Sequence, residues 1–219
     1  MKSVVERMDL HVHTAYSYDG FSTPKQIERV CQRRGITALA ITDHDCIEGA
    51  LVCQKTLPLT VVVGEEVTTR SGHLIGLFLT NLIPPGLSIG ETVLRIREQG
   101  GIVYLPHPFD RIRSARFTEG ELHALAAQFD IVEVFNARNL FEESNSRALA
   151  FARSTDRLRV AASDAHVAGE VGRSWVELAP FSTPGEFLTS LHAARLRCRR
   201  TSLTVRALTK LRKRLRGIR

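Results

Sequence analysis

Short apolar runs alternate with segments of helical periodicity along most of the chain, and this alternation restricts the fold more than any other feature. The expected strands are the runs at 7–13, 38–45, 60–67, 73–79, 101–108, 131–136 and 159–166. The expected helices lie near 23–35, 88–100, 118–129, 145–156 and 182–196. Such alternation is typical of a mostly parallel sheet covered by helices, either doubly wound or closed as a barrel. A short polar link between the third and fourth runs predicts a hairpin there.

Polar residues gather at or just past the carboxyl ends of these runs. They are His11, His13, Asp43, His44, Glu66, His107, Asn136, Asp164 and His166. In a parallel α/β protein the carboxyl ends of the strands form one face, and enzymes of this class build their sites on it. We therefore expect these side chains, which come from separate strands, to converge.

The residue types in this set indicate a metal centre. In the stretch DLHVHTAYSYDG, His11 and His13 would point to the same side of a strand, roughly 6.5 Å apart, which suits two ligands of one ion. A single histidine is usually a hydrogen-bonded imidazole, but six of the eight histidines belong to this pattern: His11, His13, His44, His73, His107 and His166. Imidazole together with carboxylate suits zinc, iron or manganese, whereas magnesium and calcium favour oxygen ligands. The absence of cysteine ligands favours an open catalytic site over a closed structural zinc site.

Five short motifs resemble those of the polymerase and histidinol phosphatase (PHP) metallophosphoesterases, in order and spacing over residues 7–170. They are DLHVHTAYSYDG at 9–20, ITDHD at 41–45, GEEVTT with GHLIGLFL from 64 to 79, PHP at 106–108 and SDAH at 163–166. The resemblance implies a distorted (β/α)7 barrel over residues 1–200 with the metal site at the C-terminal ends of the strands. It also implies two or three divalent ions, which would be Mn, Fe or Zn.

The resemblance also implies which residues bind each ion. The first ion would take His11, His13, Glu66 and Asp164; the second Glu66, His73 and His107; the third Asp19, His44 and His166. Glu66 is preferred to Glu65 because the family pattern is Gly, any residue, Glu, counted from Gly64. Asp9 and Asp43 are expected to orient the imidazoles by accepting hydrogen bonds from them.

The implied chemistry is hydrolysis of a phosphoric ester by a hydroxide that bridges the metal ions. A cationic side chain would complete the phosphate site, and Arg138 ranks ahead of Arg111 and Arg173 because it follows a strand end. Asn136 is expected to orient the substrate or to cap the following turn. His166 is expected either as a ligand or as the proton donor to the leaving oxygen.

The substrate class stays open at this point. A phosphomonoester or a small nucleotide phosphodiester is the leading interpretation. Only 33 residues separate His73 from His107, so the helical insertion of nucleotide-hydrolysing relatives is missing. Asp19 stands where histidinol phosphate phosphatases carry His, which weakens that option. The alternatives are a nuclease or nucleic-acid-associated PHP protein that uses a basic tail, and a non-catalytic metal-stabilised binding module.

The positive charge of the chain is concentrated at its end. Of 30 Lys and Arg residues, 11 lie in residues 195–219, which contain no acid, whereas the rest of the chain holds 19 bases and 23 acids. Residues 201–219 are expected to form a basic amphipathic helix or tail with a stripe of Leu208, Leu211, Leu215 and Ile218. Either this stripe packs on the barrel, or the tail binds nucleic acid, an anionic membrane surface or a partner groove.

Composition adds two further expectations. The hydrophobic content of 43% over 219 residues is typical of one globular domain. No apolar run approaches the roughly 18 residues that a membrane-spanning helix needs, and the four cysteines show no paired spacing. We therefore expect a cytoplasmic protein without a transmembrane segment that acts on a small phosphorylated substrate.

Overall fold

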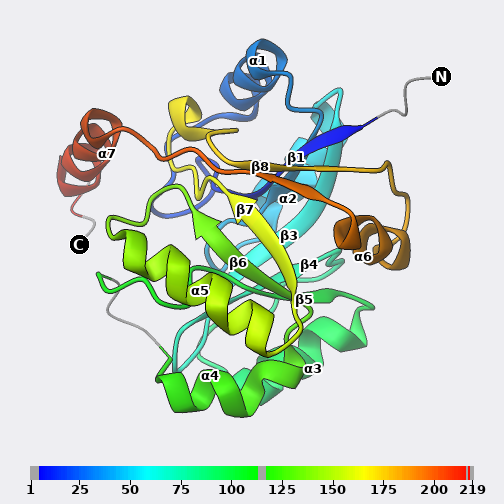
Figure 1. Cartoon of the computed structure of the whole chain (residues 1–219). Helices are drawn as coiled ribbons and strands as arrows, with labels where there is room; N and C mark the ends of the chain where they lie inside the picture. The colour runs from blue at the N-terminus through cyan, green and yellow to red at the C-terminus, as the bar shows by residue number, and fades with distance from the viewer. Residues whose placement is uncertain (1–4, 113–116, 216, 218–219) are drawn as a thin grey trace.

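The computed structural model describes residues 5–112, 117–215 and 217 (Figure 1). Its strands are β1 (Glu6–Val12), β2 (Ala38–Ile41), β3 (Thr60–Thr68), β4 (His73–Leu77), β5 (Ile102–Leu105), β6 (Ile131–Asn136), β7 (Leu158–Ala162), β8 (Trp175–Leu178) and β9 (Arg195–Arg197). Its α-helices are α1 (Pro24–Arg34), α2 (Glu48–Thr56), α3 (Ile89–Glu98), α4 (Glu119–Leu125), α5 (Glu142–Ser154), α6 (Pro184–His192) and α7 (Leu203–Leu215). Short 3-10 helices cover Ala126–Gln128 and Ala168–Glu170.

The strands form one strongly curved sheet with the order β7-β6-β5-β4-β3-β2-β1-β8-β9. The segment after β7 returns to β1, where Val12 bridges to Ala165 and the His13 amide donates to the Ala165 carbonyl at 2.8 Å. This contact nearly closes strands β1 to β7 into a barrel at their carboxyl ends. The predicted distorted seven-stranded α/β barrel is therefore confirmed.

Pairing directions agree with the sequence except at the end of the chain. The predicted hairpin is confirmed, because β3 and β4 pair antiparallel with Gly64 opposite Leu77. Helix α2 and the antiparallel strands β8 and β9 were not predicted. The buried face of α2 consists of the small residues Gly49, Ala50 and Cys53, and no side chain caps its start, so the sequence lacks both usual helix signals. Strands β8 and β9 span four and three residues, too few to show alternation.

Local sequence explains why the other helices begin where they do. Thr23 precedes α1 and accepts a hydrogen bond from the Gln26 amide, while the Gln26 side chain accepts from the Thr23 amide. This reciprocal pair satisfies two backbone donors that a helix start leaves open. Gly35 ends the helix with a φ of 65°, a left-handed conformation that glycine adopts without steric cost. Similar capping pairs begin α3 at Ser88 and α4 at Thr118.

Two apolar layers leave one end of the barrel to polar residues. The interior is filled by side chains such as Leu10, Ile75 and Tyr104, with Phe187 of α6 packed among them. A second layer, which includes Ile27 of α1, lies between the sheet and the surrounding helices. Polar side chains at the carboxyl ends of the strands are also buried, so they require hydrogen-bond or ionic partners.

Helix α7 lies at the edge of the molecule (Figure 1), and the leucines of its stripe are exposed. Leu208, Leu211 and Leu215 are 60%, 54% and 79% exposed, whereas Thr209 is fully buried. The prediction that the leucine stripe packs on the barrel is therefore wrong. Ile218 lies outside the described residues. In the described part of the chain, no helix combines the length and the apolarity needed to cross a bilayer.

Candidate metal centre

The end of β1 supplies two imidazoles to a buried cluster of four side chains. Nε2 of His11 lies 3.1 Å from Nε2 of His13 and 2.9 Å from Oε2 of Glu66. Oδ1 of Asp164 lies 3.7 Å from Nε2 of His11 and 3.4 Å from Nε2 of His13. The side chains of all four residues are fully buried. This cluster is the ligand set predicted for the first ion.

Glu66 also reaches a second group through its other oxygen. Oε1 of Glu66 lies 2.9 Å from Nδ1 of His73 and 2.9 Å from Nε2 of His107. The β3–β4 hairpin makes this possible, because it places Thr68 opposite His73 and brings that ring back over Glu66. The carboxylate thus lies between two groups of imidazoles, as a bridging ligand would.

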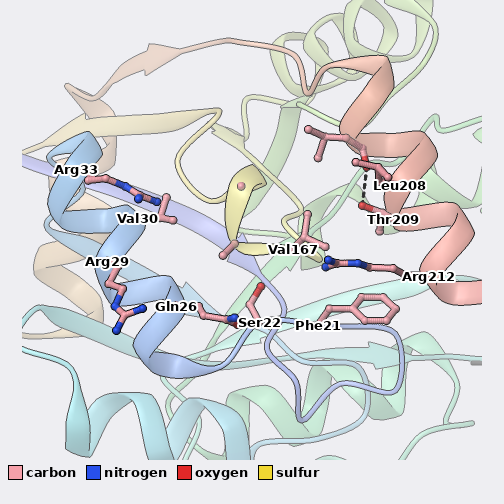
Figure 2. Close-up of a pocket in the computed structure, with 13 residues that line it drawn as sticks. Phe21, Ser22, Gln26, Arg29, Val30, Arg33, Val167, Leu208, Thr209 and Arg212 are labelled. Carbon is pink, nitrogen blue, oxygen red and sulfur yellow. Dashed lines mark hydrogen bonds between the residues drawn. The ribbon is translucent and has the colours of Figure 1, made fainter.

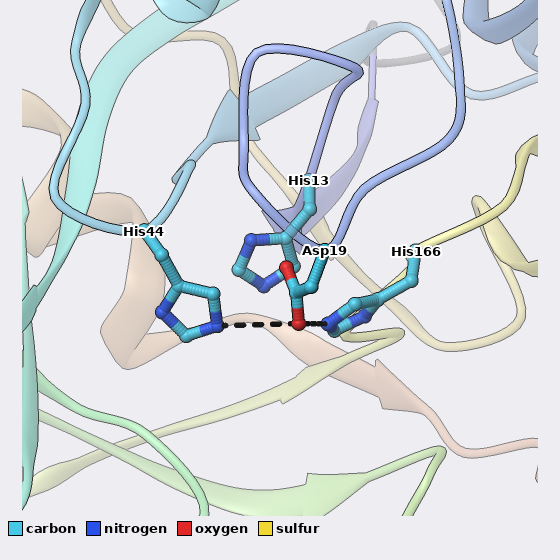
Figure 3. Close-up of side chains that lie close together, drawn as sticks. All are labelled: His13, Asp19, His44 and His166. Atoms are coloured by element: carbon cyan, nitrogen blue, oxygen red, sulfur yellow. Dashed lines mark hydrogen bonds and ion pairs between the residues drawn. The ribbon is translucent and has the colours of Figure 1, made fainter. Parts of the chain in front are cut away.

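A third group lies next to the first one (Figure 3). Oδ2 of Asp19 lies 2.8 Å from Nε2 of His166 and 3.8 Å from Nε2 of His44. The ring of Tyr18 stacks on His44 with 5.1 Å between centroids. The structure therefore places all nine predicted ligands close together, in overlapping groups in which His13 also lies near Asp19, and His44 near Glu66 and His73.

The donor atoms fit divalent metal ions. Bonds of about 2.0–2.2 Å from a metal to imidazole nitrogen or carboxylate oxygen put neighbouring ligand atoms about 3–3.5 Å apart. Nε2 of His11 lies 3.1 Å from His13 and 2.9 Å from Glu66. Nε2 of His13 lies 3.4 Å from Asp164. Two imidazole nitrogens that approach this closely beside two carboxylates have the arrangement of ligands around a shared cation.

The electrostatics of the cluster agree with this. Burial opposes the charged form of His13, but its contacts with Asp164 and Glu66 outweigh burial and raise its pKa to about 9. Burial likewise opposes the charged form of Glu66, but His44 and His11 outweigh it and hold the pKa of Glu66 well below its usual range. The carboxylates therefore favour positive charge, which ring protons or a bound cation can supply.

Glu133 of β6 is a central residue that sequence reasoning missed. Its Oε1 lies 3.1 Å from Nδ1 of His11 and accepts a hydrogen bond from the Tyr104 hydroxyl at 2.8 Å. Its Oε2 accepts from the His107 amide and from Nδ2 of Asn136, both at 2.8 Å. An acceptor at Nδ1 of His11 leaves Nε2 for a metal. The only sequence signal was a lone acid inside the apolar run IVEVFN.

Asp9 and Asp43 have a different role from the predicted one. Asp9 accepts hydrogen bonds from the backbone amides of Ser163 and Gly172 at 3.0 and 2.7 Å. Asp43 accepts from the amide and the hydroxyl of Thr14, both at 2.6 Å. These aspartates therefore fix the loops that carry the ligands. The expectation that they orient imidazoles is corrected, because Glu133 orients His11.

Glu65 lies apart from the cluster, in agreement with the choice of Glu66. Its Oε2 accepts a hydrogen bond from the Ile83 amide at 2.9 Å. Burial raises the pKa of Glu65 to about 8. It is a buried structural acid on the opposite side of β3 from the metal-binding residues.

The predicted catalytic residues are placed as follows. Asn136 is fully buried, and its Nδ2 donates to Glu133 and to Asp164, so it positions a ligand. His166 has Nε2 beside Asp19 and Nδ1 2.9 Å from the Asp164 carbonyl. Burial and the charge of Arg138 lower the pKa of His166 to about 3, and a neutral ring suits the ligand role.

The arginines predicted to bind phosphate differ in their surroundings. Nη1 of Arg138 lies 3.0 and 2.9 Å from the two carboxylate oxygens of buried Glu170. Arg111 forms an exposed ion pair with Glu143 at 3.0 Å. Arg173 lies close enough to Arg34 of α1 to contribute to lowering the pKa of that guanidinium. Of these three arginines, only Arg138 is held beside the centre.

Comparison with known proteins shows the family of this chain. The PHP domain matches residues 9–105, and the PHP-associated region matches residues 142–196. An uncharacterized protein of Methanocaldococcus jannaschii is 37% identical over 196 residues, which cover 84% of this chain and 78% of that protein. The chain belongs to the PHP family.

Two further relatives show how the domain is used elsewhere. The error-prone DNA polymerase of Mycobacterium tuberculosis is 48% identical over 70 residues, which cover 30% of this chain and 6% of the polymerase. A crystal structure of a two-domain protein from Bacteroides vulgatus, described as containing a predicted PHP-like metal-dependent phosphoesterase, aligns with a TM-score of 0.72. At 18% identity, covering 90% of this chain and 66% of that protein, it shows the shared fold alone.

Proposed function

We propose that the chain hydrolyses a phosphomonoester or a small nucleotide phosphodiester, with the nine predicted ligands holding two or three divalent ions. The observation that carries this proposal is the position of Glu66, whose two oxygens lie 2.9 Å from ligand nitrogens of three histidines. Bound Mn, Fe or Zn would supply a water of lowered pKa and would neutralise charge on the phosphate oxygens. We also propose that residues 1–200 form the barrel domain and that residues 201–219 form a basic helix or tail, as predicted from the sequence.

The protein's own residues hold the reacting groups in place. Glu133 fixes the ring of His11, and Asn136 fixes the carboxylate of Asp164. The pairs between Asp19 and His166 and between Arg138 and Glu170 fix the loop at 166–170. Because these groups are hydrogen-bonded, and all but the half-buried Arg138 are buried, the centre is organised before the substrate enters.

Hydrolysis of p-nitrophenyl phosphate and of its bis-ester tests the proposal. Protein reconstituted with Mn, Fe or Zn is expected to release p-nitrophenol, and a chelator is expected to abolish the release. Preference for the mono-ester or the bis-ester would identify the substrate class. Absence of hydrolysis of both esters with every metal, in protein that contains stoichiometric metal, would refute the proposal.

Arg206 of α7 is a second cation beside the centre, and sequence reasoning did not single it out. Its side chain is half-buried and lies within electrostatic range of Asp164 and Glu170. Burial lowers the pKa of Arg206, and the charge of Arg138 lowers it further. The Thr201 amide donates to the Ala137 carbonyl at 3.0 Å and thereby anchors the start of this helix. Within the described ranges, the guanidinium of Arg206 has no hydrogen bond or ion pair, so it is available to a phosphate.

We expect Arg206→Gln to lower kcat/KM for p-nitrophenyl phosphate by about tenfold, mainly through KM, because one charge-assisted hydrogen bond to the substrate is lost. Steady-state kinetics at saturating Mn measure the effect, and Arg206→Lys should recover part of it. Arg214→Gln, at an exposed arginine on the same helix, is the matched control. Equal kinetics in the Arg206 and Arg214 variants would exclude a substrate contact by Arg206.

A further inference from the structure

A groove of about 440 Å³ lies between α1 and α7, outside the metal centre (Figure 2). One wall is α1 and the other is the inner part of α7. Its floor is made by Phe21 and Ser22 and by the loop that follows His166. Thr209, which is fully buried, and Leu208 line the groove on the side of α7.

The groove is strongly cationic. Arg29 and Arg33 extend from adjacent turns of α1, and Arg212 reaches across from α7 above the ring of Phe21 (Figure 2). These three arginines form no ion pair with any residue that the structure describes. No described residue of the lining is acidic. Three uncompensated guanidinium groups around one concave site are a typical binding site for phosphate.

A buried hydroxyl lies in the floor of the same groove. Ser22 is 1% exposed, and in the described part of the chain its Oγ has no hydrogen-bond partner. Buried polar atoms in proteins nearly always have a partner, so an orphaned hydroxyl that lines a groove indicates a ligand that completes it. A phosphate oxygen is an acceptor that this hydroxyl could serve.

The groove and the metal centre share two loops. The first loop carries Asp19 to the centre and, two residues later, Phe21 to the groove. The second loop carries His166 to the centre and Val167 to the groove. The Phe21 amide donates to the His166 carbonyl at 2.9 Å and joins the two loops. The groove therefore lies beside the loops that carry Asp19 and His166.

We propose that the groove binds a phosphate of the substrate other than the one that is cleaved. This inference rests on the proposed phosphoesterase function and names its substrate class: a multiply phosphorylated ester, specifically a short single-stranded nucleic acid. The three arginines contact the backbone phosphates of the strand. Exposed Lys210 continues the positive charge along α7.

Fluorescence anisotropy of a labelled single-stranded oligodeoxynucleotide tests the proposal, with the full-length chain in a chelator so that nothing is cleaved. The triple variant Arg29→Gln, Arg33→Gln, Arg212→Gln is expected to bind at least tenfold more weakly. The slope of log K against log salt should fall by about 2, because each lost phosphate contact removes about 0.7. Ser22→Ala should weaken binding without changing this slope.

The control carries a similar loss of charge outside the groove. Lys25→Gln with Arg214→Gln removes two exposed cations from the same helices, and neither residue lines the groove. Equal weakening in the control and in the triple variant would show that binding follows net charge alone. No weakening in the triple variant would show that the groove does not bind the oligonucleotide. Either result would overturn the proposal. Melting temperatures of all variants in the same buffer establish that they are folded.

Competition separates the two sources of phosphate. A longer unlabelled strand is expected to displace the oligonucleotide, whereas a mononucleotide or inorganic phosphate at a similar phosphate concentration is not. This result would support a nucleic-acid substrate. Equal displacement by a mononucleotide would overturn the nucleic-acid assignment and leave a small-phosphate site. Binding does not require catalysis, so a failure to hydrolyse nitrophenyl esters would refute the phosphoesterase proposal without changing this result.

Discussion

Glu66→Gln is expected to abolish metal-dependent hydrolysis, with a loss greater than about 100-fold, because changes in residues that merely orient a metal ligand already cost about 10–100-fold. The carboxylate lies 2.9 Å from the ligand nitrogens of His11, His73 and His107. An amide removes the negative charge and replaces one of the two oxygens by a nitrogen that cannot bind a metal cation. Both neighbouring ligand groups are therefore weakened by one substitution.

The metal-to-protein ratio after gel filtration and kcat with p-nitrophenyl phosphate measure this effect. Glu65→Gln is the matched control, because Glu65 is the adjacent buried acid and contacts the Ile83 amide on the other side of the strand. We expect Glu65→Gln to keep its metal content and activity. A Glu66→Gln variant with full metal content and activity would show that Glu66 is not a bridging ligand.

Glu133→Ala is expected to lower the free energy of unfolding by about 3–5 kcal/mol, the range found when one member of a buried charged pair is removed. Burial opposes the charged form of Glu133, but His11 outweighs it and holds the pKa of the carboxyl below its usual value. The substitution leaves the Tyr104 hydroxyl and Nδ2 of Asn136 without this acceptor in the interior. Metal affinity should fall by about 10–100-fold, because His11 loses the group that fixes its ring.

Urea unfolding in a chelator and again with Mn separates these two effects of Glu133→Ala. The free energy of unfolding in the chelator measures the effect of the lost hydrogen bonds. The further increase in this free energy on adding Mn measures the loss of metal affinity. Glu98→Ala on the exposed face of α3 serves as the control, with an expected change within about 0.5 kcal/mol. A Glu133→Ala variant as stable as this control in the chelator would show that the buried network does not stabilise the barrel.

The motifs predicted which polar residues lie close together, because of how the fold is built. His11 lies near the end of β1, and His44 and His107 follow β2 and β5; the carboxyl ends of these strands meet at one end of the barrel. Any chain that forms this barrel brings such residues together, so their positions along the sequence were sufficient. The hairpin that returns His73 to Glu66 was predicted for the same reason, from two apolar runs and a short polar link.

Residues that act through their neighbours were not predictable in this way. Glu133 looked like one acid in an apolar strand, and its role depends on Tyr104 of the adjacent strand and on the His107 amide. Arg138 was predicted as a free cation, and its pairing depends on Glu170, more than thirty residues later. Hydrogen-bond partners are selected by distances across the sheet, which sequence spacing does not determine.

The sequence by itself determined the alternation of strands and helices, because periodicity is a local property, and its motifs carried the resemblance to the PHP family and thereby the expected barrel. Only the tertiary structure decided how α7 is oriented. The sequence showed that Leu208, Leu211 and Leu215 share one face, but periodicity does not state which face meets the barrel. The anchor from Thr201 to Ala137 and the burial of Thr209 turn the leucines outward. The cationic groove beside α7 follows from that packing, because it forms only where two helices distant in sequence lie side by side.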